Sequence, residues 1–96
     1  MPLYLVPRTR AWLSEEELAA TADCLQAVDA ISPEIRWIRS YVVHEPDGSL
    51  GTICIYQASS PEKIREHAFR SDMPATEIFE VADTVVVRPD PVAAAA

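Results

Sequence analysis

Glycine is scarce in this chain of 96 residues, which contains only Gly48 and Gly51. Loops that cradle phosphate groups need several closely spaced glycines, so the sequence excludes a nucleotide site of that kind. The signatures Gly-x-Ser-x-Gly and His-Glu-x-x-His are also absent, which removes the local motifs of serine hydrolases and zinc peptidases. A nucleophile activated by residues that are distant in the sequence stays open.

Basic residues are also few, because 8 Lys and Arg stand against 15 Asp and Glu, for a formal net charge of -7. A surface of this sign repels nucleic-acid phosphates and anionic lipid headgroups, so we expect neither nucleic acid nor a membrane as a partner. No apolar run approaches the roughly 20 residues that cross a bilayer. The N-terminal MPLYLVPRTR lacks the features of a signal peptide, and we expect a cytoplasmic protein.

Cysteine is limited to Cys24 and Cys54, which are not part of a Cys-x-x-Cys motif. This usage is typical of reduced thiols and argues against a disulfide framework or a structural zinc site.

The residue pattern predicts alternating strands and helices. Ser14 followed by three glutamates is a capping box, and Ser60-Pro61-Glu62 is a second helix start with proline at the first helical position. Two β-branched and aromatic runs flank the turn residues Pro46-Asp47-Gly48, which predicts a hairpin. We expect strands over residues 2–8, 35–43, 50–58 and 77–87, helices over 14–32 and 60–71, and one helical turn over 75–78.

The hairpin carries apolar residues on both faces. With a two-residue loop at Asp47-Gly48, Tyr41 lies opposite Cys54, whereas a three-residue loop would break that alignment. The first register places Trp37, Tyr41, Cys54 and Tyr56 on one face and Ile38, Val42, Ile53 and Ile55 on the other.

The element order β-α-β-β-α-β predicts an α+β, ferredoxin-like sandwich, with a four-stranded antiparallel sheet and both helices on one face. We expect one domain over residues 1–88 and a flexible tail over 89–96. The helices would cover the Ile38 face and leave the aromatic face open. A second copy of the chain is the simplest cover, which predicts a homodimer that forms an α+β barrel.

Several spaced motifs occur together in the chain: Ser40-Tyr41, Cys54-Ile55-Tyr56, Ala58, His67 and Pro74-Ala75. Over about residues 2–82 the chain resembles a family of small actinobacterial-type proteins, of which one described kind is a nickel-binding protein of dimeric ferredoxin-like fold. The resemblance implies a non-enzymatic homodimer that binds nickel or another divalent metal ion. The turn from His44 to Gly51 looks longer than the short turn of that family.

The candidate metal ligands are His67, Cys54 and His44, because imidazole and thiolate suit nickel or zinc, with carboxylates and water to complete the shell. His67 is either a ligand or a core histidine, and Cys54 is either a ligand or an inert strand residue. His44 lies beside carboxylates in what is either a weak metal site or a solvated turn. In the expected register Cys54 points away from the helices and His67 toward the sheet, so a shared site would need a sheet edge or a second copy.

The alternative function is an enzyme or small-molecule binder of the dimeric α+β barrel type, a fold that hosts monooxygenases and isomerases. Trp37, Tyr41, Tyr56 and His67 would line its pocket, with His67 as acid or base. Arg39 shares the face of Trp37 and Tyr41, where it could hold an anion or, as we favour, form an ion pair at the dimer interface. A third class is a structural or regulatory dimer without a ligand.

Overall fold

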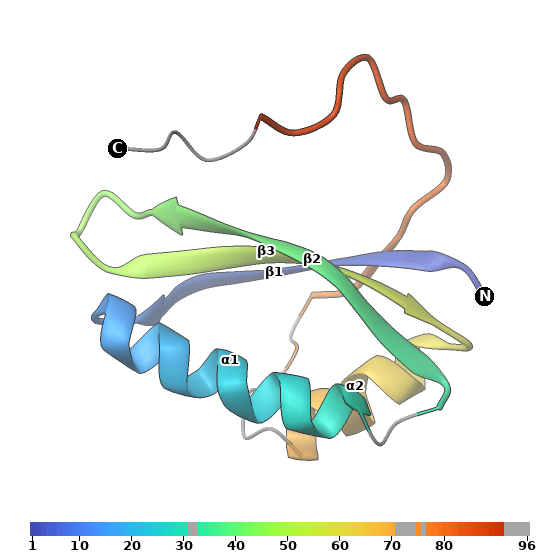
Figure 1. Cartoon of the computed structure of the whole chain (residues 1–96), viewed down its shortest axis with the longest axis horizontal. Helices are drawn as coiled ribbons and strands as arrows, with labels where there is room; N and C mark the ends of the chain where they lie inside the picture. The colour runs from blue at the N-terminus through green and yellow to red at the C-terminus, as the bar shows by residue number, and fades with distance from the viewer. Residues whose placement is uncertain (31–32, 71–74, 76, 92–96) are drawn as a thin grey trace.

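The computed structural model describes residues 1–30, 33–70, 75 and 77–91. Within these ranges the chain forms two helices and four strands in the predicted β-α-β-β-α-β order (Figure 1). The elements are β1 (Leu3–Trp12), α1 (Glu15–Ala30), β2 (Ile35–His44), β3 (Leu50–Ala58), α2 (Pro61–Arg70) and β4 (Phe79–Glu80).

The strands form one antiparallel sheet in the order β2-β3-β1-β4. Both helices pack on one face of this sheet, and the chain that follows β4 runs across the other face (Figure 1). The predicted ferredoxin-like α+β fold is therefore confirmed. Neither helix has the length and apolar composition that would let it cross a membrane, as far as the chain is described.

The helix starts are those that the sequence predicts. Ser14 Oγ accepts a hydrogen bond of 3.2 Å from the Glu17 amide, and the Glu17 carboxylate accepts one of 3.4 Å from the Leu13 amide. Two amide donors at the start of α1 are thereby satisfied. Helix α2 begins at Pro61, directly after Ser60.

The outer strands differ from the prediction. Strand β1 continues to Trp12 instead of ending at Arg8, with an irregularity in its pairing after Arg8 and a φ of 53° at Arg10. Strand β4 contains only Phe79 and Glu80, so the predicted strand over residues 77–87 was wrong for most of its length. A helical turn was predicted over residues 75–78. The described residues of this range are not helical, and Thr76 lies outside the described residues.

The hairpin has a three-residue loop, the second of the two alternatives that the sequence leaves open. The Glu45 amide donates to the Ser49 carbonyl at 3.0 Å, and His44 pairs with Leu50. Ser40 therefore lies opposite Cys54, and Tyr41 lies opposite Ile53. The prediction that Tyr41 faces Cys54 was wrong by one residue.

A second shift occurs inside β2, where the pairing with β3 is interrupted between Trp37 and Arg39. Trp37 pairs with Tyr56, whereas Arg39 pairs with the next residue of β3, Ile55. Ile38 is thus an extra residue, a β-bulge. Since strand residues alternate between faces, the bulge places Trp37 and Tyr41 on opposite faces, against the prediction.

Most residues of the hairpin lie on the face opposite to the predicted one, whereas Tyr41 and Val42 keep their predicted faces. The core lies between the sheet and the helices and consists of Tyr4, Val6, Ile35, Cys54, Tyr56, Ala58 and Ile64, with Trp37 packed against it. Tyr56 and Cys54 thus face the helices, with exposed fractions of 0% and 2%. We use the name open sheet face for the opposite side, made of Leu3, Leu5, Tyr41, Ile53 and Ile55, none of which is buried.

Gly51 allows β1 and β3 to approach closely. A Cβ atom at this position would lie 2.8 Å from the Arg8 carbonyl oxygen and 3.3 Å from the Glu45 side chain. Because a backbone oxygen in a paired strand cannot move freely, we expect Gly51→Ala to lower the free energy of unfolding by about 2 kcal/mol. In the matched variant Gly48→Ala the added Cβ atom has no neighbour within 4 Å, and the strain comes from the φ of 87° alone. We expect this variant to lower the free energy of unfolding by about 1 kcal/mol. Urea titration of both variants checks this order. Equal stability of Gly51→Ala and the wild type would refute the prediction.

Candidate functional site

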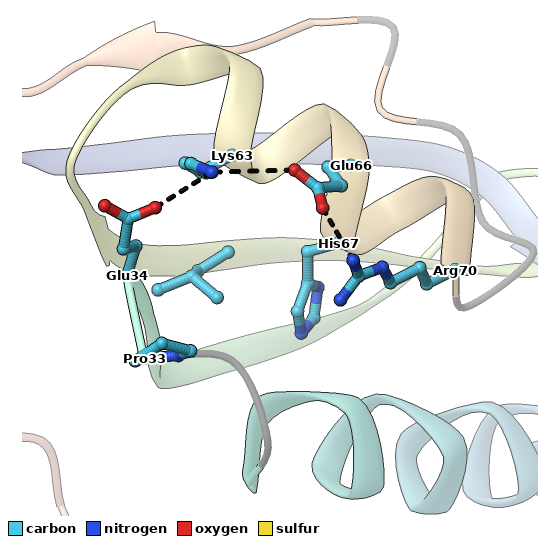
Figure 2. A pocket seen from close by; sticks show the side chains of 7 residues that line it. Pro33, Glu34, Lys63, Glu66, His67 and Arg70 are labelled. Carbon is cyan, nitrogen blue, oxygen red and sulfur yellow. Dashed lines mark hydrogen bonds and ion pairs between the residues drawn. The ribbon is translucent and has the colours of Figure 1, made fainter.

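His67 lies on the sheet-facing side of α2 and is 3% exposed. Its ring meets the ring of Tyr56 edge to face, with the centroids 5.7 Å apart. A cavity of about 220 Å³ lies between α2 and the start of β2. The His67 imidazole points into it (Figure 2). The placement of His67 on the buried stripe of the second helix is confirmed.

Charged side chains form the rim of this cavity (Figure 2). Lys63 Nζ lies 2.8 Å from a Glu34 oxygen and 3.8 Å from a Glu66 oxygen, and Arg70 lies 2.7 Å from the other Glu66 oxygen. The pKa of Lys63 is raised, first by the hydrogen bond and charge of Glu34 and then by Glu66. Both carboxylates near His67 are therefore already engaged with cations.

Cys54 lies on the same side of the sheet as His67, which corrects the prediction that it points away from the helices. Its Sγ accepts hydrogen bonds from Ser40 Oγ at 3.0 Å and from the Arg8 guanidinium at 3.5 Å, and it donates to Thr52 Oγ1 at 3.5 Å. A guanidinium beside the sulfur opposes the approach of a metal cation. Cys54 is thus less suited to nickel than its residue type suggests.

Arg8, which contacts Cys54, is a buried residue that the sequence analysis missed. It is 7% exposed although it carries a charge. A signal was present, since Tyr4, Val6 and Arg8 alternate along β1 and so share one face. The end of the predicted strand at Arg8 concealed it, because terminal residues are usually solvated.

Tyr56 is a neighbour of both Cys54 and His67. Burial raises the pKa of its phenol to about 12, and Cys54 adds to this rise, whereas the Arg8 guanidinium opposes it. Arg8 and Cys54 act on the hydroxyl both through their charges and as hydrogen-bonding neighbours.

His44, the third candidate ligand, ends β2 and is exposed. The carboxylates expected to assist it are held by Arg10, whose amide donates to Glu45 at 2.8 Å and whose Nε lies 3.7 Å from Asp47. The pKa of Asp47 is lowered, chiefly by the hydrogen bond from the Ser49 hydroxyl. Within one chain the structure does not bring His44 together with His67.

The pocket predicted from Trp37, Tyr41, Tyr56 and His67 does not form within one chain. Trp37 lines a cavity beneath α1, His67 lines the cavity of Figure 2, and Tyr41 lies on the open sheet face. The alternative function loses its expected geometry for this reason.

Arg39 and Tyr41 meet the C-terminal segment on the open sheet face. Arg39 lies 2.9 Å from Asp90, the Tyr41 hydroxyl donates to Asp90 at 2.7 Å, and Arg39 donates to Tyr41 at 3.3 Å. The pKa of Arg39 is raised, first by Tyr41 and then by Asp90. Between this segment and the sheet a hollow of about 640 Å³ remains, so the segment covers the face incompletely.

The arrangement of the described donor side chains argues against a complete metal site within one chain. Among residues 1–30, 33–70, 75 and 77–91, no group of three or more His, Cys, Asp and Glu side chains is arranged to hold a metal ion. The described residues of one chain thus do not fit a complete nickel site.

Comparison with known proteins identifies relatives of this chain. It is similar in structure to SCO4226 from Streptomyces coelicolor A3(2), with a TM-score of 0.69 and 17% sequence identity over 86% of this chain and 99% of the other. At this identity the likeness shows the fold alone. No curated protein matches the chain. The family described as nickel responsive protein SCO4226-like matches residues 4–81, and the chain therefore belongs to this family.

Proposed function

We propose that the protein is a non-enzymatic nickel-binding homodimer in which His67 supplies an imidazole ligand. The observation that carries the proposal is the match of residues 4–81 to a family described as nickel responsive. Imidazole nitrogen and carboxylate oxygen are both suitable nickel ligands, and His67 lines a cavity whose rim carries Glu34 and Glu66.

The proposal requires donors beyond those that the structure describes in one chain. Glu34 and Glu66 pair with Lys63 and Arg70, so a carboxylate would have to exchange a cation for the metal. Water or a second copy of the chain would supply the remaining ligands.

The homodimer is supported by the open sheet face. Leu5 of β1 and Ile55 of β3 pair at the middle of this face, and neither is fully buried. The segment that crosses the face leaves the hollow of about 640 Å³ beneath it. An apolar sheet face that is incompletely covered favours association with a second copy through the same surface.

Nickel titration of tag-free, metal-stripped protein by calorimetry tests the metal part of the proposal. We expect saturable binding in the wild type and a loss of affinity of about tenfold or more in His67→Ala, because one ligand is removed. His44→Ala is the matched control and should bind like the wild type, since His44 is exposed at the end of β2. No saturable binding by the wild type, or full affinity in His67→Ala, would contradict the proposal.

A further inference from the structure

We propose that the cavity beneath α1 is a binding site for small uncharged aromatic molecules. The cavity has a volume of about 270 Å³ and lies between α1 and the sheet, away from the charged rim around His67. Its walls come from β1, α1, β2 and β3, and include Trp12, Leu18, Ala22, Trp37 and Cys54.

The cavity is bordered by residues 15–22 of α1, whose side chains are exposed or half-buried. The described α1 side chains include none that is fully buried, and those directed to the cavity, Leu18, Thr21 and Ala22, are only half-buried. Alanines at positions 19 and 22 stand where a tightly packed helix would carry larger side chains. The small side chains at these positions therefore leave space between this part of α1 and the sheet.

Aromatic rings form two of the walls. Trp12 is 3% exposed, and Trp37 packs against the core from β2. Flat indole surfaces favour flat aromatic partners through stacked and edge-to-face contacts. An apolar cavity of about 150 Å³ already binds benzene, so the larger space beneath α1 admits a molecule of two or more rings.

The polar groups around the cavity are already satisfied by one another. Trp12 Nε1 donates to Thr21 Oγ1 at 3.0 Å and Trp37 Nε1 to Ser40 Oγ at 2.7 Å. The Ser40 hydroxyl in turn donates to Cys54 Sγ at 3.0 Å. Such a wall has little to offer a charged ligand, whose desolvation would remain uncompensated.

Charge at the cavity points the same way. Glu15, in the first turn of α1, is the charged residue among those that line it, and the chain as a whole carries a net charge of -7. Arg8, which contacts Cys54 Sγ at 3.5 Å, is not among the lining residues, so an anionic aromatic molecule would meet the Glu15 carboxylate and the site selects against anions.

Two fluorescent probes test the proposal: N-phenyl-1-naphthylamine, which is uncharged, and 8-anilino-1-naphthalenesulfonate, which has the same rings and one sulfonate. The protein has two tryptophans, and both line the cavity. We expect the neutral probe to quench tryptophan emission and saturate, and the anionic probe to bind about tenfold or more weakly. Equal affinity for both probes, or no binding of the neutral probe, would overturn the proposal.

Matched variants of α1 locate the bound probe. Ala22→Phe fills the cavity and should weaken binding of the neutral probe by about tenfold or more, whereas Ala20→Phe, at an exposed position outside the lining, should leave the affinity within about twofold. Ala22→Leu, a smaller change with the same expected direction, replaces Ala22→Phe if circular dichroism shows that variant to be unfolded. Undiminished binding in the folded cavity-filling variant would refute the site, because the probe would then lie elsewhere, for example on the open sheet face.

Discussion

Replacing Ile55 by glutamate is expected to prevent the proposed homodimer and to leave a monomer of 10.6 kDa. Ile55 lies on β3, an inner strand, and pairs with Leu5 on one side and Arg39 on the other. In a two-fold dimer built on the open sheet face, each interface would bury two new carboxylates without partners. We expect the dissociation constant to rise by about a thousandfold or more, measured by sedimentation equilibrium.

Phe69→Glu is the control for this prediction. Phe69 is 82% exposed on α2, on the other side of the sheet, so its replacement changes charge and apolar surface without touching the proposed interface. Tyr41→Glu, on the edge strand β2, gives a second test if Ile55→Glu does not fold. A monomeric wild type at micromolar concentration, or an Ile55→Glu protein that remains dimeric, would reject the homodimer.

The fold could be predicted from the sequence because the starts of the helices and the hairpin turn have strong local signals. The serine caps at Ser14 and Ser60 and the turn residues after Glu45 separate the elements, and short connections leave few ways to pack them. The last strand was overestimated because a valine run has high β propensity. In the structure Val85, Val86 and Val87 are 71–83% exposed and belong to no strand, since pairing with β1 ends near Glu80.

The faces of the sheet were not accessible in the same way. Ile53 and Ile55 alternate with Cys54 and Tyr56, so both faces of β3 are apolar and the pattern does not say which one meets the helices. One additional loop residue then shifted the register, and the bulge at Ile38 shifted it again. The loop had a local signal, because Pro46 and a glycine with a φ of 87° at position 48 suit a type I turn closed by a glycine bulge. The bulge at Ile38 has no such signal, since it depends on packing across the sheet.

The candidate site was predicted in part. The burial of His67 followed from helical periodicity, but its proximity to Glu34 did not, because Glu34 and Lys63 belong to segments that meet only in the folded chain. The Arg8 contact to Cys54 spans 46 positions and depends on the β1–β3 register. Sequence reasoning therefore named the histidine and the cysteine without the charges that decide what each can bind.

The second large effect is expected at alkaline pH, where ionisation of Tyr56 should destabilise the fold. Burial raises the pKa of Tyr56 from 10.0 to about 12 in the folded protein. The folded state thus holds the phenol proton more tightly than the unfolded chain does. The stabilisation is complete below about pH 10 and is lost as the pH rises through about 12, for a total of about 3 kcal/mol.

Tyr56→Phe isolates this contribution. The pKa values of Tyr4 and Lys63 are also raised in the folded protein, so the wild-type stability falls with alkaline pH for more than one reason. Phenylalanine keeps the edge-to-face contact with His67. Loss of the hydroxyl's interactions with Arg8 and Cys54 lowers the stability already at neutral pH, so the slopes of stability against pH are compared and not the absolute values. Urea titrations at several pH values between about 8 and about 11.5 should show a shallower decline for Tyr56→Phe than for the wild type. If the stability of the two proteins declined in parallel, ionisation of Tyr56 would not be a cause of the alkaline destabilisation.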